Sequence, residues 1–253
     1  MRHLEIKNKH ERDPYIDFVE STHTYTYHGD EFISVTTWIS KIFDEFNTDA
    51  VISGMMQSKK WNEHHMYYGK TKEEIKNIWK ERNQVAIEQG ILLHQNIEDY
   101  LNNITVDNKS IEYKYFLNFV RDHVDMEFFR TEWKVYDESL KLAGTIDMCS
   151  KNSDGTISLY DWKRSRAIKR RNNFDKFSKI EGLKNLEDTN FNHYALQLNF
   201  YRYIVEKKYN MKVKNMFIVC FHPDNKNSDY LLYKIPAMQN EIEKIIEFIK
   251  KKN

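Results

Sequence analysis

The chain has 253 residues, of which 39 are lysine or arginine and 38 are aspartate or glutamate, so its formal net charge at pH 7 is +1. This length is enough for one large domain, or for a core with a helical insertion. Only 7 glycines and 3 prolines argue against extended disorder. The total charge says nothing about nucleic-acid binding, which depends on where the charge is concentrated.

The N-terminal part is predicted to form short strands followed by helices. Residues 15–32 have a strand pattern around a turn at His28-Gly29-Asp30, and a helix is expected over Thr36–Phe43. Thr71-Lys72-Glu73-Glu74 is a capping-box sequence, which predicts the start of a long helix that runs towards Glu88. Apolar residues recur there at helical spacing, which is typical of a face that packs on a core.

A second helical stretch follows directly. Gly90 either breaks the long helix or allows another segment to approach closely, and the helical pattern continues over Ile91–Leu101. His94 and Glu98 are four residues apart, so they share one face of the helix. Their side chains form either an ordinary surface contact or part of a site.

The C-terminal half is predicted to contain, in order, a helix, three strands, a helix, two strands and a final helix. These elements are expected over Ile111–His123, Glu132–Tyr136, Thr145–Ser150, Thr156–Lys163, Phe191–Lys208, Asn215–Phe221, Tyr230–Ile235 and Met238–Lys251. Strands and helices mixed in this way predict an α/β (α+β) fold. The polar residues 172–190 are expected to form a long loop.

The second and third of these strands carry the most informative residues. They flank the turn signal Ser153-Asp154-Gly155. If the turn has three residues, with its glycine in the left-handed conformation, Asp147 lies opposite Asp161 on one face of the sheet, and Lys163 shares that face. A two-residue turn would instead send Asp161 to the other face.

Asp147, Asp161 and Lys163 are a residue set suited to cutting phosphodiesters. Two carboxylates on one buried face repel each other unless a cation lies between them, and Mg²⁺ or Mn²⁺ prefers such oxygen ligands. A bound ion would activate water and stabilise the leaving oxygen. Lys163 would then either orient the attacking water or neutralise charge on the phosphate. An isolated Asp-x-Lys sequence is more often a surface pair, so the surrounding motifs decide.

A basic run follows the candidate lysine. Residues 163–171, KRSRAIKRR, contain six basic residues in nine and no acid. We interpret the run as a phosphate-binding segment because it begins at Lys163, and the alternative is a solvated surface. The lysines at the C-terminus are expected to end a helix favourably.

The remaining composition concerns compartment and cofactors. Cys149 and Cys220 both lie in predicted strands, which indicates buried thiols in a reducing compartment. We find no apolar run of about 18 residues, so we expect no membrane span. We find no signal peptide and no typical transit peptide. We therefore expect a soluble intracellular protein that is cytoplasmic or nuclear, and a viral origin is compatible with this.

Four motifs together resemble the PD-(D/E)XK nuclease superfamily, specifically its RecB-like branch. They are Gly90-x-x-x-His94-x-x-x-Glu98, Gly144-Thr145-Ile146-Asp147, Asp161-Trp162-Lys163 and Gln197-x-x-x-Tyr201, and their order and spacing match as well. Ser34-Val35-Thr36 and the Asp-Trp-Lys form of the core motif are closer to the mitochondrial genome maintenance exonuclease family and related nucleases of large DNA viruses. Similarity covers about residues 23–221. Arg164 departs from the threonine that is common in that family, whereas Ser165 matches.

The resemblance implies a fold and a site. It implies a restriction-endonuclease-like core over residues 131–253, in which helices flank a central mixed sheet. Residues 1–130 are expected to form an N-terminal region of strands and helices that covers the active site. Residues 90–103 of this region are expected to contribute to the core, so that the whole chain forms one compact unit. It implies metal ligation by His94, Asp147, Asp161 and the carbonyl of Trp162. Glu98 is a candidate for orienting His94, and Glu132 is either a weaker candidate ligand or a partner for nearby basic groups. The substrate contacts that we expect are Ser34, Thr36, Arg164, Ser165, Arg166, Lys169, Arg170, Gln197 and Tyr201. The helix face of Tyr201 packs either on nucleotide or simply on the sheet.

The expected function is a Mg²⁺- or Mn²⁺-dependent DNA exonuclease that acts on single-stranded ends or flaps. Because two cysteines cannot ligate the four-cysteine iron–sulfur cluster of some relatives, we expect no such cluster. An endonuclease or RNA nuclease of the same fold is the first alternative, because one fold serves many substrates. A nucleic-acid-binding subunit that has lost catalysis is the second. The sequence leaves protein partners open.

Overall fold

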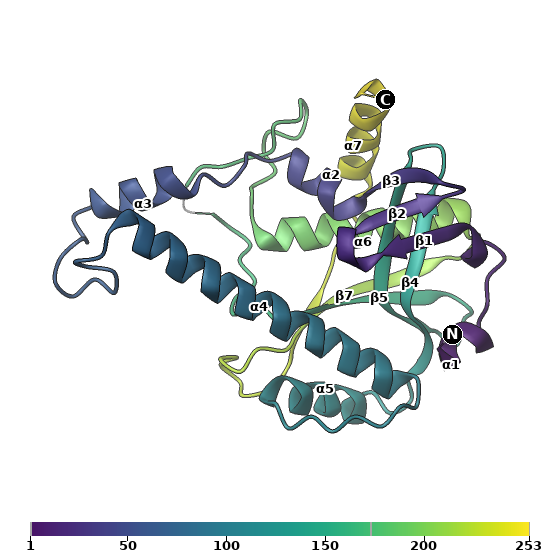
Figure 1. Cartoon of the computed structure of the whole chain (residues 1–253). Coiled ribbons are helices and arrows are strands. Elements are labelled where there is room, and N and C mark those ends of the chain that lie inside the picture. Colours follow the sequence, from purple (N-terminus) through teal and green to yellow (C-terminus); the bar gives the residue numbers. More distant parts are fainter. Residues whose placement is uncertain (1, 173, 253) are drawn as a thin grey trace. The chain divides into compact units, whose positions relative to one another are not determined.

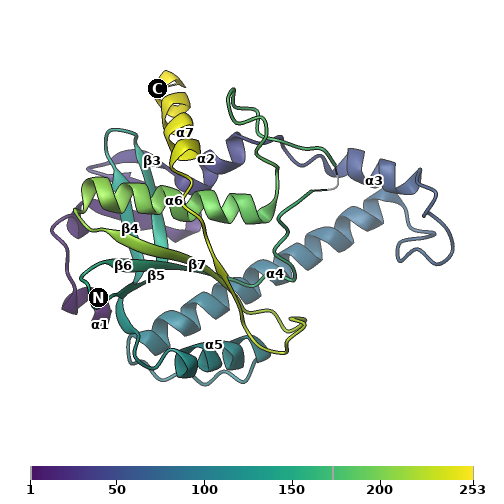
Figure 2. The same ribbon diagram turned by 180° about the vertical axis from the view of Figure 1, so that it is seen from behind.

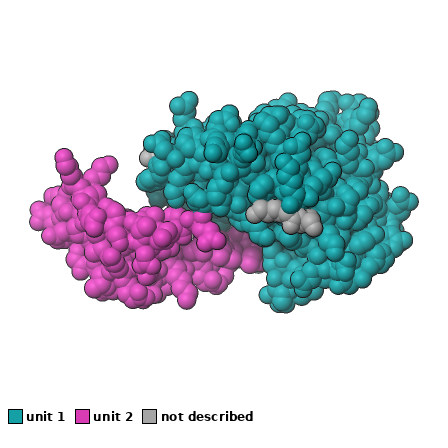
Figure 3. Space-filling view, turned by 90° about the horizontal axis from the view of Figure 1, so that it is seen from above, with its two compact units in different colours: residues 1–44, 93–253 teal, residues 45–92 magenta. Residues whose placement is uncertain are grey.

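The computed structural model describes residues 2–172 and 174–252, which form an α+β structure. The chain divides into two compact units, one made of residues 1–44 and 93–253 and the other of residues 45–92 (Figure 3). The expected boundary after residue 130 therefore needs correction. It falls inside β4 (Glu127–Asp137), and a strand that pairs along its length cannot be divided between two domains.

The first unit begins with short elements. They are α1 (His3–Lys7), the 3-10 turns η1 (Asp13–Tyr15) and η2 (Glu20–Thr22), β1 (Ile16–Val19), β2 (Thr24–Tyr27), β3 (Asp30–Ser34) and α2 (Val35–Lys41). The expected turn joins β2 to β3, with His28 at φ 50° and Gly29 at φ 88°. Two left-handed residues are what a two-residue hairpin turn requires.

The second unit contains α3 (Thr48–Met56) and the first part of α4 (Lys72–Leu101). The predicted capping box starts α4, because the Thr71 amide donates to Glu74 Oε2 at 2.7 Å and the Glu74 amide donates to Thr71 Oγ1 at 3.2 Å. Gly90 lies within α4 and does not break it. A glycine costs a helix only about 1 kcal/mol relative to alanine, which the other residues of this 30-residue helix offset.

The other elements belong to the first unit. They are α5 (Ile111–Asp122), β4, β5 (Leu142–Lys151), β6 (Ile157–Lys163), α6 (Asn190–Lys208), β7 (Val213–Cys220), β8 (Leu231–Lys234) and α7 (Gln239–Lys252). Within the described residues the strands form one mixed sheet in the order β1-β2-β3-β5-β6-β7-β8, and β4 pairs with β5 (Figure 1). The sheet is parallel between β3 and β5 and between β6 and β7, so the predicted mixed sheet is confirmed.

The pairing of β5 is unusual. β4 pairs with it antiparallel from Leu142 to Lys151, which occupies one whole edge. Because a strand has only two edges, β3 at Leu142 and Ala143 shares the other edge with β6, which pairs from Met148 to Lys151. In the part of the chain that the structure describes, residues 144–147 thus have no strand partner on that edge.

Helices cover both faces of this sheet. Successive residues of a strand point to opposite faces, and Leu159 of β6 belongs to a core formed with α2, α6 and α7. Its neighbours Tyr160 and Trp162 belong to another core, formed with α5 and the end of α4 (Figures 1 and 2). Cys149 and Cys220 are buried free thiols, as predicted. Among the described helices, none has the length and apolar character that crossing a bilayer requires.

Candidate metal centre

The β5–β6 hairpin has the turn that the site hypothesis requires. The Asn152 amide donates to the Thr156 carbonyl at 2.8 Å, which leaves three residues in the turn, and Gly155 has φ 81°. The strand register pairs Met148 with Tyr160. One step further along this register, Asp147 lies opposite Asp161, so the predicted three-residue turn and its register are confirmed.

The two carboxylates are buried where the strands begin to separate. Asp147 and Asp161 are 8% and 1% exposed. The Trp162 amide donates to Asp147 Oδ2 at 2.6 Å, so a side-chain carboxylate replaces the backbone carbonyl that would accept this hydrogen bond in a regular sheet. Burial raises the pKa of Asp161 to about 6, with Lys163 opposing the shift and Asp147 adding to it, and burial likewise raises the pKa of Asp147.

Lys163 is held against Asp161. Its Nζ donates to Asp161 Oδ1 at 2.8 Å and lies 2.7 Å from Oδ2, and it lies 4.9 Å from the centre of the Tyr194 ring. Burial lowers the pKa of Lys163, but the carboxylates of Asp161 and Asp147 outweigh it and raise the pKa above its usual range. The ion pair with Asp161 therefore favours the protonated form of Lys163.

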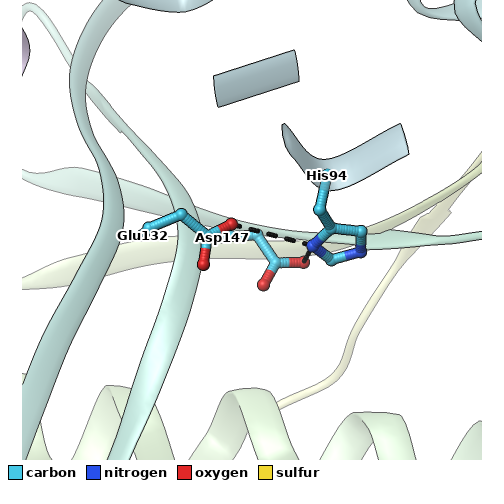
Figure 4. Close-up of side chains that lie close together, drawn as sticks. All are labelled: His94, Glu132 and Asp147. Atoms are coloured by element: carbon cyan, nitrogen blue, oxygen red, sulfur yellow. Dashed lines mark ion pairs between the residues drawn. The ribbon is translucent and has the colours of Figure 1, made fainter. Parts of the chain in front are cut away.

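Three side chains converge beside this pair. His94 Nδ1 lies 3.7 Å from both Glu132 Oε1 and Asp147 Oδ2, and the three side chains point towards one another from α4, β4 and β5 (Figure 4). His94 Nε2 lies 3.0 Å from the Trp162 carbonyl and can donate to it, which leaves Nδ1 free to ligate. Burial lowers the pKa of His94, but the two carboxylates raise it to about 9.

Glu132 reaches this position through an unusual backbone conformation. It has φ 42° within β4, in the left-handed region that residues with a side chain seldom adopt. Its neighbours Thr131 and Trp133 pair with Met148 and Ile146, so Glu132 lies opposite Asp147. Glu132 pairs with His94, as the expectation of a basic partner predicts, and the same contact makes it a candidate metal ligand. Strain of this kind is typical of functional sites.

This donor set could hold a divalent cation, since the three ligand atoms lie within 4.8 Å of one another. Two atoms that ligate one Mg²⁺ at about 2.1 Å lie at most about 4.2 Å apart, and the two 3.7 Å distances from His94 Nδ1 satisfy this limit. Asp161 Oδ2 is buried without a hydrogen bond, although Lys163 lies beside it. Asp161, which was expected as a ligand, is not one of the three, and its carboxylate contacts Lys163. The Trp162 carbonyl, also expected as a ligand, lies against His94 Nε2.

Gln197 and Tyr201 connect α6 to the centre. Gln197 Nε2 donates to Asp161 Oδ1 at 3.1 Å and to Tyr201 Oη at 3.2 Å. Tyr201 packs over Gly144, where an added Cβ would lie 2.5 Å from its ring. Tyr25 of β2 also approaches the centre, since its hydroxyl lies 2.9 Å from Thr145 Oγ1. Tyr201, at 3% exposure, thus packs on the sheet.

The expected substrate residues of the N-terminal part divide in two. Ser34 is buried and caps α2, accepting from the Thr37 amide at 3.0 Å. Thr36 is exposed. Glu98, expected to orient His94, instead pairs with Arg2 at 3.3 Å, and the Trp162 carbonyl takes that role.

The basic run also divides. Arg164 is committed to Glu112 of α5 at 2.7 Å, and the Ser165 hydroxyl donates to the carbonyl of Ala167. Three others are exposed: Arg166, Lys169 and Arg170. Their side chains remain available to a ligand, apart from local contacts of Arg166 with Asp224 and of Arg170 with the Phe191 ring.

Comparisons with protein-family models and with curated protein sequences found no match.

Two residues of the site were missed or undervalued from the sequence. Glu132 could have been found by pairing its strand antiparallel with β5, which sets it opposite Asp147. Tyr194 lies one helical turn before Gln197 on α6, so the same helix face carries it towards Lys163.

Proposed function

We propose that this protein is a metal-dependent nuclease of the PD-(D/E)XK type, and that it degrades DNA from single-stranded ends or flaps. The observation that carries the proposal is the convergence of His94, Glu132 and Asp147 on one point, beside a buried Asp161–Lys163 pair. A structural ion pair needs no such group of donors. The preference for single-stranded ends rests on the sequence resemblance alone.

The residues support a division of roles. His94, Glu132 and Asp147 would hold Mg²⁺ or Mn²⁺, which when bound lowers the pKa of water and neutralises charge on the phosphate. Lys163, whose pKa the carboxylates of Asp161 and Asp147 raise, would stabilise negative charge on the phosphate as the bond breaks. Asp161 holds Lys163 in place through Oδ1, and Gln197 fixes that carboxylate from α6.

The test is digestion of end-labelled single strands, duplexes and closed circles, as DNA and as RNA, with Mg²⁺, Mn²⁺ or chelator. Asp161→Asn and Lys163→Ala should each lower the cleavage rate at least about a hundredfold. Asp125→Asn is the matched control, because Asp125 is exposed and makes no ion pair or hydrogen bond to the rest of the described chain. Normal turnover in Asp161→Asn would contradict the proposal.

The substrates separate the alternatives. An enzyme that requires ends spares closed circles, whereas an endonuclease cuts them. Preferential cleavage of RNA would favour the RNA nuclease, and binding without cleavage under every metal condition would favour the non-catalytic subunit.

A further inference from the structure

The left-handed backbone of Glu132 needs contacts that hold it. At φ 42° a residue with a side chain persists only where the surrounding structure determines its conformation, and Glu132 uses this conformation to face His94 (Figure 4). The contacts in question lie on its neighbours in β4. Arg130, two residues before Glu132, and Trp133, directly after it, both reach the same acidic side chain, that of Asp13.

Asp13 is a buried acceptor for both neighbours. Its Oδ2 accepts from Arg130 Nη1 at 2.8 Å, and its Oδ1 accepts from Trp133 Nε1 at 3.0 Å. The His10 amide also donates to Oδ2 at 2.9 Å and so fixes the carboxylate. The side chains of Arg130 and Asp13 are only 4% and 12% exposed, so little water can compete for these contacts.

The spacing of the two donors depends on the irregular backbone between them. Arg130 and Trp133 are three residues apart, and in a regular strand an odd separation sends side chains to opposite faces. Here both reach one carboxylate, and the guanidinium carbon of Arg130 lies 5.2 Å from the centre of the Trp133 ring. The left-handed Glu132 interrupts the alternation. An extended Glu132 would separate the two donors, so that Asp13 would lose one of these hydrogen bonds.

We propose that Asp13 is a positioning residue, which holds Glu132 in the left-handed conformation that faces His94 and so places a metal ligand before the ion binds. Its relevance to the metal rests on the proposed function. Asp13 is not one of the three donors and acts only through the two neighbours of Glu132. Without it, only a fraction of the molecules has Glu132 in place, and the apparent metal affinity falls by that fraction.

The first measurement needs no metal. Glycine tolerates a left-handed backbone better than alanine does, so Glu132→Gly should have an unfolding equilibrium constant about threefold to tenfold lower than Glu132→Ala, by urea denaturation. In an Asp13→Asn background position 132 relaxes towards an ordinary strand, where alanine should equal or exceed glycine. Glu138→Gln is the matched control background, because Glu138 pairs with another arginine, Arg12, at 2.8 Å. It should preserve the advantage of glycine.

The second measurement is Mn²⁺ affinity by calorimetry, at a temperature where every variant is folded. Asp13→Asn should weaken binding about fivefold to thirtyfold, the population that a left-handed residue loses without support. In a Glu132→Ala background the same change should have little further effect, since Asp13 acts through Glu132. Ile249→Ala, which truncates a buried residue of α7, lowers stability and should leave the affinity unchanged.

The outcomes separate this proposal from the proposed function. An advantage of glycine that persists in Asp13→Asn, or that is absent when Asp13 is present, overturns the role of Asp13. So does a loss of Mn²⁺ affinity that is equally large with and without Glu132. Loss of the glycine advantage, together with a loss of affinity that requires Glu132, supports it. If the protein binds no Mn²⁺, the proposed metal centre fails, and the glycine comparison still decides whether Asp13 positions Glu132.

A second variant covers the case in which Asp13→Asn does not fold. Removing one partner of a buried ion pair leaves an unpartnered charge, whereas replacing both partners does not. Asp13→Asn combined with Arg130→Met then serves as the background for both measurements, and the expected results are the same.

Discussion

Replacing Gly144 by alanine tests how closely the candidate centre depends on the packing of α6. The added Cβ would lie 2.5 Å from Tyr201 Cε1 and 2.9 Å from its Oη. Tyr201 is 3% exposed, so the ring cannot move into solvent. It also accepts a hydrogen bond from Gln197, which in turn holds Asp161. Relief of the clash therefore displaces Tyr201, the partner of the glutamine that holds the Asp161 carboxylate.

The expected loss of stability follows from the overlap. Overpacking of this kind costs about 1–3 kcal/mol, and each kcal/mol shifts Tm by about 2–4 °C in a protein of this size, so Tm should fall by roughly 2–12 °C. The free energy of unfolding is measured by urea denaturation, Tm is measured by thermal denaturation, and the cleavage rate is measured in parallel. Gly54→Ala is the control, because Gly54 lies in α3 with open space around its Cβ position. It should be neutral or slightly stabilising.

A double-mutant cycle identifies the contact. Tyr201→Leu removes the ring that the new methyl group would strike, so Gly144→Ala should cost much less stability in that background. If Gly144→Ala is as stable as the wild type, or if its cost is the same with and without Tyr201→Leu, the contact at the Gly144 position is not the cause.

Three further predictions concern charge. Burial opposes ionisation of Asp13, but its hydrogen bond from the buried Arg130 outweighs burial and lowers the pKa of Asp13 in the folded protein. The ionised Asp13 therefore stabilises the fold at pH values above its pKa in the unfolded chain, and this stabilisation is lost as the pH falls through its pKa in the folded protein. Asp13→Asn should thus cost about 3–5 kcal/mol of unfolding free energy at pH 7 and less at pH 3, and equal costs would contradict this. Glu132→Gln should weaken Mn²⁺ binding in calorimetry at least about tenfold, and unchanged affinity would move the site elsewhere. Neutralising the exposed basic residues together should reduce the salt slope of single-strand binding by about two, and an unchanged slope would indicate a solvated surface; the set is Arg166, Lys169 and Arg170.

The parts of the fold that local chemistry determines could be predicted from the sequence. Gly155 allows the left-handed residue of a three-residue turn, which sets Asp147 opposite Asp161. Thr71 and Glu74 form the reciprocal cap that starts α4. In each case a few neighbouring residues determine the conformation, so no distant contact is needed to infer it.

The parts that depend on distant contacts could not be predicted. Glu98 shares a helix face with His94, but its partner is Arg2, almost a hundred residues away in the sequence. Glu132 looks like an ordinary strand residue, and only its pairing opposite Asp147 and its left-handed backbone bring it to the centre. Helical and strand periodicity specify which face a residue occupies, but not which residue from another element meets it there.

The candidate centre lies where the hydrogen-bond ladder of the sheet divides. In a continuous ladder, strands about 4.8 Å apart leave no room between them for a ligand. Beyond Met148 and Tyr160, β6 no longer pairs with β5, and the Trp162 amide turns to the Asp147 carboxylate instead of a backbone acceptor. The Trp162 carbonyl is likewise free to hold His94. The divergence thus supplies the backbone groups that orient two of the three donors, His94 and Asp147.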